Sequence, residues 1–555
     1  MAEVKITKGY IPGSIGRVAE LHGAYYHQRW DFPYPSQRMP VFARNMAATS
    51  QPLAAQAGLE ILRKGGNAAD AAIAVAITLT VVECTCNGIG GDAFAIIWDN
   101  KSEKLYGLNA SGKSPKSWNF EYFNKKYKKM PFVGWDTVTV PGAVSGWLAL
   151  SDRFGRLPFE TLFQPAINYA KNGFHVSPIT AKLWKRVIIK YKEFPDFINN
   201  FTFQGRAPEA GEKICFFDQA NTLTEIGQTK TQSFYRGRLA DKITAHAQST
   251  GGFITKDDLL NHQAEWLEPI SIHYKGFDVH EIPPNGQGIA VLIMLAILSH
   301  LNIEKYPLDS ADSIHLQIEA MKLAFADLYQ YISDPDYMNI DYHDLLNESY
   351  LSERAKCIHL NKAQNISFGF PREQGDTVYL TTADEEGMMV SFIQSNYTDF
   401  GSGIVVPGTG ISLQSRGACF SLKKNHPNRV EGGKRPFHTI IPAFVTKKGQ
   451  PFMSFGVMGG AMQPQGQTQI LVRMIDYHQN SQAASDAPRW CVLSDMEVAF
   501  EKGTNEEVMK DLEKRGHEIT IGDSSLFGGA QLIHKINQGY CGTSDHRKDG
   551  QAAGF

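Results

Sequence analysis

The sequence contains few of the patterns that mark metal, redox or membrane proteins. Its seven cysteines are dispersed and include no Cys-x-x-Cys pair, which argues against a zinc site or a disulfide framework and favours a reducing compartment. The longest apolar runs, residues 71–82 and 288–298, are shorter than the roughly 20 residues of a membrane-spanning helix. The first residues lack the apolar core of a signal peptide. We therefore expect a cytoplasmic protein with no membrane partner.

Motifs for metal or cofactor binding and for the common hydrolase sites are also missing. There is no His-Glu-x-x-His and no Gly-x-Ser-x-Gly, and His315 and His438 are interpreted as structural. The glycine cluster at 87–92 lacks the spacing of a nucleotide-binding loop, so a tight turn is the better interpretation. A net charge of −2 argues against a nucleic-acid partner. We predict no metal and no cofactor, although a Ser-His-Asp triad with distant members stays open.

What the chain does contain is a large, ordinary core. It has 555 residues, of which 43% are hydrophobic, and no internal repeat or obvious linker. Residues 1–42 are interpreted as an irregular arm, 150–275 as mainly helical, and 361–376 as an exposed loop. The hydrophobic pattern predicts helices at 51–64, 67–82, 294–301, 314–331 and 465–478, and strands at 45–50, 93–98, 105–110, 377–383, 388–395, 440–446 and 452–457.

The strands at 377–383 and 388–395 are joined by a short acidic turn, Asp-Glu-Glu-Gly, and predict a β-hairpin. Most hairpins are scaffold, and that interpretation stays open here. If the turn is centred on residues 385–386, the pairing places Gln394 or Ser395 opposite Thr377. A hydroxyl at Ser395 would then lie within reach of the Thr377 hydroxyl and could orient it.

Thr377 is a candidate nucleophile. A threonine hydroxyl needs an adjacent base, and an N-terminal threonine carries one as its own α-amino group. This requires cleavage between Asp376 and Thr377, which Thr377 could itself perform by attacking the Asp376 carbonyl. Acyl transfer also needs oxyanion donors, which the backbone of Gly459 and Gly460 could supply. An ordinary turn at these glycines is the alternative.

Short stretches distributed in order along the chain carry a more specific signal. They are 49–54, 65–72, 87–92, 283–288, 376–377, 400–403, 459–460, 486–489 and 549–554. Together they resemble the γ-glutamyltranspeptidase family of N-terminal-nucleophile hydrolases, from about Asn45 to Phe555. The resemblance implies an α+β fold, a four-layer αββα sandwich formed jointly by two subunits of one cleaved precursor.

The same resemblance assigns the halves of the chain and the catalytic roles. Residues 1–376 would be the large subunit and 377–555 the small one, together forming one structural domain. Thr377 would be nucleophile and, through its amine, base. Ser395 would orient its hydroxyl, and Gly459 and Gly460 would form the oxyanion hole.

The expected substrate pocket departs from the family. The arginine that holds the γ-glutamyl carboxylate has no match in residues 109–115, where Lys113 offers a charge without a bidentate fork. Tyr397 stands where the family has asparagine, Cys419 where it has the acid that binds the α-amino group, and His438 and Thr439 where it has paired serines. Arg416 is either a new anion anchor or an ordinary surface arginine.

The expected function is an autoprocessed γ-glutamyltransferase or hydrolase that cleaves an amide through an acyl-threonine and passes the acyl group to water or an amine. Its partners would be a small-molecule amide or γ-glutamyl substrate, an amine or dipeptide acceptor, and the other subunit of its precursor; a homodimer is left open. One alternative is a non-glutamyl amidohydrolase resembling oxamate amidohydrolase or the cephalosporin acylases of this family. The other is an unprocessed, inactive relative used for binding or scaffolding.

Overall fold

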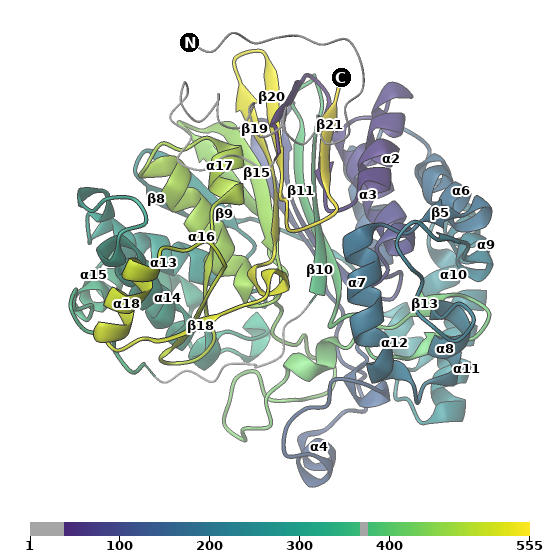
Figure 1. Ribbon diagram of the computed structural model, residues 1–555. Helices are drawn as coiled ribbons and strands as arrows, with labels where there is room; N and C mark the ends of the chain where they lie inside the picture. Colours follow the sequence, from purple (N-terminus) through teal and green to yellow (C-terminus); the bar gives the residue numbers. More distant parts are fainter. Residues whose placement is uncertain (1–37, 367–375) are drawn as a thin grey trace.

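The computed structural model describes residues 38–366 and 376–555, and two seven-stranded antiparallel sheets form its centre (Figure 1). The first sheet has the spatial order β1 (Val41–Ala43), β20 (Gly539–Ser544), β19 (Gly529–Ile536), β15 (Gln450–Met458), β14 (Ala443–Lys447), β9 (Phe277–Glu281) and β8 (Ile270–Tyr274). The second has the order β21 (Gln551–Gly554), β2 (Met46–Thr49), β10 (Asp376–Ala383), β11 (Met389–Tyr397), β3 (Asp92–Asp99), β4 (Lys104–Ala110) and β7 (Glu265–Leu267).

The two sheets pack face to face. β10 and β11 contact β15 across the interface, and β10 also contacts β19. Successive side chains of a strand point to opposite faces of its sheet. One face of each sheet therefore supplies the side chains that pack between the two sheets. Its buried members include Phe94, Tyr379, Ile393 and Phe444. The hairpin of β10 and β11 is therefore packed against the first sheet on this face.

Helices cover the outer faces of both sheets, giving a helix–sheet–sheet–helix arrangement (Figure 1). The second sheet is covered by α2 (Pro52–Arg63), α3 (Ala68–Val82) and α5 (Ala143–Phe154). The first is covered by α13 (Ile289–Ser299) and α16 (Met462–Ile475), with α14 (Ala311–Tyr331) packed on α13. The predicted mixed α+β class is confirmed.

The remaining elements lie around this centre. The other α-helices are α4 (Phe120–Lys126), α6 (Gln164–Asn172), α7 (Pro178–Val187), α8 (Pro195–Phe201), α9 (Phe217–Gln228), α10 (Gln232–Tyr235), α11 (Arg238–Thr250), α12 (Lys256–Leu260), α15 (Glu348–Lys356), α17 (Ser481–Asp486) and α18 (Glu506–Lys514). The other strands are β5 (Phe174–His175), β6 (Lys213–Ile214), β12 (Val405–Val406), β13 (Ile411–Ser412), β16 (Trp490–Val492), β17 (Glu497–Phe500) and β18 (Glu518–Ile521). Across the described residues, every helix is too short or too polar to cross a membrane.

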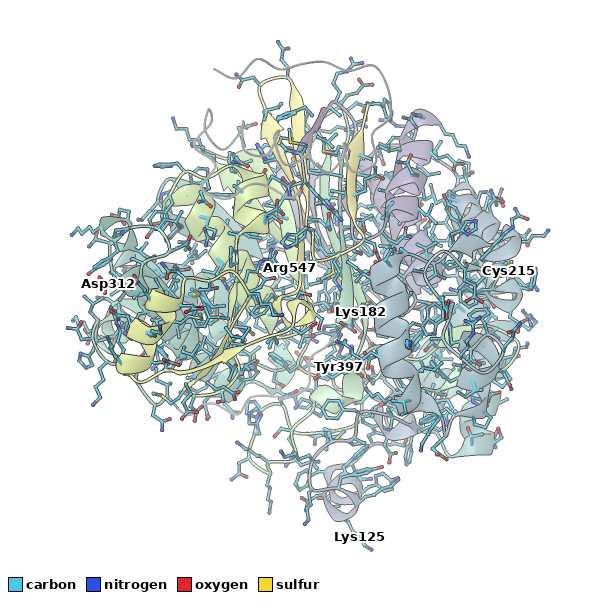
Figure 2. All side chains as sticks on the ribbon, viewed as in Figure 1. Lys125, Lys182, Cys215, Asp312, Tyr397 and Arg547 are labelled. Carbon is cyan, nitrogen blue, oxygen red and sulfur yellow. The ribbon has the colours of Figure 1, made fainter. Side chains whose placement is uncertain are left out.

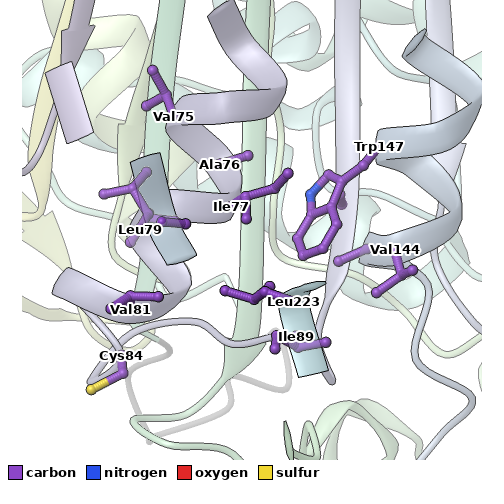
Figure 3. Packing of buried hydrophobic residues seen from close by; sticks show 14 of the residues in the cluster. Val75, Ala76, Ile77, Leu79, Val81, Cys84, Ile89, Val144, Trp147 and Leu223 are labelled. Carbon is purple, nitrogen blue, oxygen red and sulfur yellow. The ribbon is translucent and has the colours of Figure 1, made fainter. Parts of the chain in front are cut away.

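Helix α3 shows how the sequence builds the core. Asn67 caps its first turn in a reciprocal pair with Asp70, and every residue of the helix is buried. Its apolar side chains pack with Trp147 of α5 and Leu223 of α9 (Figure 3). The helix is alanine-rich and apolar all round, as the sequence predicted for a buried helix. It packs directly against β10 and β11 and fixes the position of the hairpin.

The hairpin of β10 and β11 is confirmed, and of the two registers left open the structure has the one that places Ser395 beside Thr377. From Val378 to Ala383 each residue pairs with the partner expected for a turn centred on residues 385–386, for example Val378 with Gln394. Gly387 has a φ of 96° in that turn, a value that favours glycine.

One region differs from the predicted secondary structure, and two predicted segments lie partly or mostly outside the described residues. Residues 265–274 form β7 and β8 rather than helix, because alternating apolar residues in this stretch pair with the sheets. The predicted arm falls mostly on residues 1–37, outside the described residues, although Val41–Ala43 forms the edge strand β1. Residues 367–375 of the predicted exposed loop also lie outside them.

Candidate active site

Thr377 lies in β10 at a break in the strand pairing. Asp376 pairs with Tyr397 and Val378 with Gln394, so the register shifts by one residue between them. Such a bulge re-aims a side chain and is common beside active sites. Thr377 is almost completely buried. The bulge therefore takes Thr377 out of the regular ladder while leaving it beside Ser395.

Ser395 connects Thr377 to the peptide bond that precedes it. Its Oγ accepts hydrogen bonds from the Thr377 hydroxyl at 3.4 Å and from the Tyr397 N–H at 2.8 Å. Its own hydroxyl donates to the Asp376 carbonyl oxygen at 2.7 Å. One hydroxyl hydrogen and two lone pairs account for all three bonds. A hydrogen bond to this carbonyl polarises it toward attack by a nearby nucleophile.

Gln463 is a second contact of Thr377 that the sequence did not indicate. It lies in the first turn of α16, and its Nε2 donates to Thr377 Oγ1 at 3.4 Å. Its Oε1 accepts the Ile441 N–H at 3.1 Å, which fixes the orientation of the amide group. The sequence does have glutamine at the alternate positions 463, 465, 467 and 469, and the structure buries all four side chains.

Gly459 and Gly460 form the turn from β15 into α16. Their φ values are 115° and 57°, and the first is accessible to glycine almost alone. Neither N–H donates a hydrogen bond to another group in residues 38–366 or 376–555. The Gly460 carbonyl accepts from Gln287 Nε2 at 2.8 Å and from the Gln463 N–H at 3.2 Å. The glycine pair is thus tied to the residue that contacts Thr377.

Charged side chains surround the peptide bond on its Asp376 side. Burial, and then the neighbouring Asp376 carboxyl, raise the pKa of Asp399 to about 7. Lys190 Nζ forms an ion pair with Asp399 at 3.2 Å and acts against that rise. Burial also raises the pKa of Glu83 to about 7, with Lys548 opposing the shift. The carboxyl of Asp376 therefore lies within a buried, charged environment.

The predicted substrate residues Tyr397, Arg416, Cys419 and Thr439 come together, with Tyr397 labelled near the centre of the molecule in Figure 2. Arg416 begins a short 3-10 helix, Arg416–Cys419, and is fully buried, so the surface interpretation of this arginine is wrong. Its guanidinium lies 4.6 Å from the centre of the Tyr397 ring. Its Nη1 donates to Thr439 Oγ1 at 2.8 Å and contacts Cys419 Sγ at 3.8 Å.

His438 meets Asp92, a residue that sequence analysis passed over. His438 Nε2 lies 3.2 Å from Asp92 Oδ2, and both side chains are fully buried. Burial, and then Arg416, hold the pKa of His438 well below its usual range, so the ring is neutral. The Ile440 N–H points to His438 Nδ1 at 3.3 Å, which assigns the ring hydrogen to Nε2 and directs it at Asp92.

Lys113 is the one predicted pocket residue that joins none of these contacts among the described residues. Its backbone carbonyl accepts the Val140 N–H, and the following Ser114 is tied to residue 434. The neighbouring Gly112 N–H instead donates to Asp92 Oδ1 at 3.0 Å. The segment at 109–115 therefore contributes a backbone N–H group to these contacts rather than a charged side chain.

The glycines at 87–92 serve close packing. A Cβ on Gly91 would lie 2.6 Å from the Ser395 carbonyl oxygen, so only glycine lets this turn approach β11. The tight-turn interpretation of this cluster is confirmed.

A separate buried cluster of His315, Glu319 and His517 has the residue types of a metal site. Several of its polar atoms already have protein partners: His315 Nδ1 and His517 Nε2 lie 2.8 Å apart, and Lys322 Nζ lies 2.7 Å from Glu319 Oε1. A buried ammonium beside the carboxylate opposes a cation there. We interpret this cluster as a hydrogen-bonded part of the core.

Several known proteins are similar to this chain in sequence and in fold. The gamma-glutamyltranspeptidase family model matches residues 54–555. The glutathione hydrolase-like YwrD proenzyme of Bacillus subtilis is 36% identical, over 92% of this chain and 98% of that protein. The oxamate amidohydrolase proenzyme of Klebsiella pneumoniae is 33% identical, over 93% and 99%. The structure of cephalosporin acylase from Bacillus halodurans has a TM-score of 0.89 at 47% identity, over 94% and 98%.

Proposed function

The chain belongs to the γ-glutamyltranspeptidase family, whose members here include hydrolases and acylases, and on that premise we propose that it cleaves an amide through an ester on Thr377. The observation that carries the proposal is the hydrogen-bonded series from the Thr377 hydroxyl through Ser395 to the Asp376 carbonyl. The bulge that takes Thr377 out of the regular ladder also supports the proposal.

The first step is self-cleavage. Thr377 Oγ1 attacks the carbonyl carbon of Asp376, the carbon–nitrogen bond breaks, and the nitrogen takes up the hydroxyl proton as the free α-amine. Water then hydrolyses the resulting ester. The products are residues 1–376 and 377–555, which remain together because β10 and β11 of the second fragment pair with β2 and β3 of the first. The proenzyme names of both curated relatives support such processing.

Catalysis repeats this chemistry on an external amide. The α-amine of Thr377 accepts the hydroxyl proton as Oγ1 attacks, and it later delivers that proton to the leaving amine. The N–H groups of Gly459 and Gly460 are the proposed donors to the oxyanion. Gln463 holds the Thr377 hydroxyl from the α16 side. Water or an amine acceptor then releases the acyl group. The partners of the proposed reaction are small molecules, namely the amide substrate and its acceptor.

The acyl group is less determined than the mechanism. The two curated relatives and the solved structure are named for three different substrates: glutathione, oxamate and a cephalosporin. An α-amino clamp would need an acid, and Cys419 stands there instead, with burial raising the pKa of its thiol. The lack of an acid at this position supports a second candidate function: a non-glutamyl amidohydrolase rather than a glutathione-cleaving enzyme.

Self-cleavage separates an enzyme from a scaffold. Purified protein is expected to contain two fragments whose masses match a cut before Thr377, with threonine at the new N-terminus. Thr377→Ala should remain one chain, and Thr377→Ser should still cut. A wild-type chain that stays whole under all refolding and pH conditions would support the inactive scaffold alternative instead.

A further inference from the structure

One end of the molecule carries a small projection that the proposed reaction does not use. It consists of residues 116–130, which include α4, and residues 421–434, which follow the 3-10 helix Arg416–Cys419. In Figure 1, α4 lies below the two sheets, at the end of the molecule opposite the C-terminus. We call these two segments the basic projection. Lys125 of α4 is exposed and is labelled at its tip in Figure 2, so the tip is open to contact with a partner.

A small hydrophobic cluster holds the two segments of the basic projection together, although they are far apart in the sequence. Its buried members are Trp118, Phe123, Met130, Phe420 and Val430. Gly432 allows a close approach, because a Cβ there would lie 2.2 Å from the Lys116 carbonyl oxygen. The Arg429 guanidinium lies 5.4 Å from the centre of the Phe120 ring, a further contact between the segments. The charged side chains of both segments are therefore presented on one packed scaffold.

The basic projection concentrates positive charge in a chain whose net charge is −2. Residues 116–130 contain five lysines and one glutamate, a net charge of +4. Residues 421–434 contain three lysines, one arginine and one glutamate, a net charge of +3 with the histidine neutral. The projection thus carries +7, and the rest of the chain is acidic. Such an asymmetry creates a local positive potential that the net charge of the whole chain conceals.

Six lysines of the basic projection are exposed and have no counter-ion. Two nearby acids are already paired, Asp136 with Lys126 at 2.7 Å and Glu431 with Arg429 at 3.3 Å. A third acid, Glu121, is exposed on α4. The exposed ammonium groups that form neither an ion pair nor a hydrogen bond with another described residue are those of Lys116, Lys125, Lys128, Lys129, Lys423 and Lys424. Unpaired positive charges gathered in this way point to an anionic partner.

The aromatic rings of the projection are not free to stack on nucleic-acid bases. The hydroxyls of Tyr122 and Tyr127 donate to Asp136 at 3.2 and 2.6 Å, and the Tyr122 ring packs edge-on against Phe123 and Phe253. Proteins that bind single strands without sequence preference rely on open aromatic faces. The unpaired cations are all lysines, which lack the fork that arginine uses to read bases. The projection is therefore better suited to a partner that offers negative charge alone.

The surface of an anionic bilayer is such a partner. Its headgroups form a continuous layer, so the lysines need no fixed spacing, and each lysine near the surface strengthens binding by about fivefold. The exposed large hydrophobic side chains of the described residues all lie outside the projection. The projection thus presents charge without an apolar group to insert into the hydrocarbon, which gives electrostatic and reversible binding.

We propose that the basic projection binds reversibly to the surface of a bilayer that contains anionic lipid. This goes beyond the proposed function and does not depend on cleavage before Thr377. It revises the expectation of no membrane partner, which was based on the length of the apolar runs. Binding to a surface needs no spanning segment, and the helices of the described residues include none.

Co-sedimentation of the purified wild-type protein with lipid vesicles tests the proposal. Phosphatidylcholine vesicles with about one third phosphatidylglycerol should bind the protein at about 0.1 M salt at least about tenfold more tightly than vesicles of phosphatidylcholine alone. Raising the salt to about 1 M shortens the screening length from about 10 Å to about 3 Å. The higher salt should therefore release the protein from the anionic vesicles.

Substitutions at the tip of the projection test whether it carries the binding. The combination of Lys125→Gln, Lys128→Gln and Lys129→Gln should weaken binding to the anionic vesicles by roughly 100-fold, because each lysine contributes about fivefold. The same three positions changed to arginine should keep the affinity within about threefold, since only the charge is required. Unchanged melting temperatures show that both triple variants are folded.

The matched control combines Lys171→Gln, Lys502→Gln and Lys514→Gln. These lysines are also exposed, form no ion pair with another described residue, and lie outside the basic projection. The control removes the same net charge as the triple glutamine variant of the projection. It should bind the anionic vesicles as the wild type does.

Each result supports or overturns the proposal. Equal binding to both kinds of vesicle, an equal loss in the two triple glutamine variants, or unchanged binding without the three projection lysines would overturn it. Labelled single-stranded RNA and duplex DNA are measured in parallel by fluorescence anisotropy. Nucleic acid that binds through the same lysines more tightly than the anionic vesicles would assign the projection to a nucleic-acid partner instead. A chain that stays uncut overturns the proposed function and leaves vesicle binding unaffected, so the two failures are distinguishable.

Discussion

The hydroxyl of Ser395 donates to the carbonyl oxygen of Asp376 at 2.7 Å, a shorter contact than the 3.4 Å between Ser395 and the Thr377 hydroxyl. Ser395 therefore contacts both the Asp376–Thr377 peptide bond and the Thr377 hydroxyl, which are the bond and the nucleophile of the proposed self-cleavage. The Asp376 carbonyl and the Thr377 hydroxyl share one partner. The strand bulge makes this possible, because a regular ladder would point them apart.

Replacing Ser395 should separate self-cleavage from folding. Ser395→Ala removes the donor to the Asp376 carbonyl, and we expect self-cleavage to slow by roughly 100-fold. Ser395→Thr retains the hydroxyl and should cleave at a rate within about fivefold of wild type. The measurement is the rate of fragment appearance on denaturing gels. Equal rates in Ser395→Ala and wild type would remove Ser395 from the cleavage step.

Gln463 should act by positioning. Gln463→Met removes its N–H from Thr377 and leaves the Ile441 N–H without its acceptor, so we expect roughly 1–3 kcal/mol lower stability and about tenfold lower kcat. Gln469→Met is the control, because Gln469 lies on the same helix and bonds only to Gln465 and Trp490. Gln469→Met should lower the stability and leave kcat unchanged. Similar kcat losses in both variants would assign Gln463 a purely structural role.

The hairpin could be predicted from the sequence, and its register to within one residue, because alternating residues and a four-residue acidic turn constrain both. The buried helix α3 followed from its uninterrupted apolar surface. These features are local or periodic. Thr377 could be proposed as a nucleophile because it starts a strand directly after a predicted exposed loop, where cleavage would give it the α-amino group that it needs as a base.

Asp92, Gln463 and the burial of Arg416 could not be predicted in that way. Each depends on segments far apart in the chain: Gln463 is fixed by Ile441, and Arg416 by Thr439 and Tyr397. Arginine is usually exposed, so the sequence alone favoured a surface position. Only the packed structure shows that its charge is buried between Tyr397 and Thr439.

The stability of the precursor should depend on pH through Asp399. Its pKa is raised from 3.8 to about 7, so the folded chain binds this proton more tightly than the unfolded chain, and the free energy of unfolding falls as pH rises between these values. In a Thr377→Ala background, Asp399→Asn removes this loss. Its melting temperature relative to the parent should rise by roughly 1–3 °C across that window and stay constant at higher pH. A difference that does not vary with pH would show that Asp399 has an ordinary pKa.

Backbone strain and oxyanion binding can be separated at Gly459. Gly459→Ala forces a side chain onto a φ of 115° and places its Cβ 3.0 Å from Gly528 Cα, so the turn that presents both N–H groups must shift. We expect roughly 1–3 kcal/mol lower stability and a kcat reduced by about 100-fold. Gly449→Ala is the matched control, because Gly449 also has a positive φ of 72° but lies in the open turn between β14 and β15 with nothing within 4 Å of its Cβ position. It should lose about 1 kcal/mol of stability and no activity. If both variants lose activity in proportion to stability, the glycine pair serves the fold, and the oxyanion donors must be sought elsewhere around Thr377.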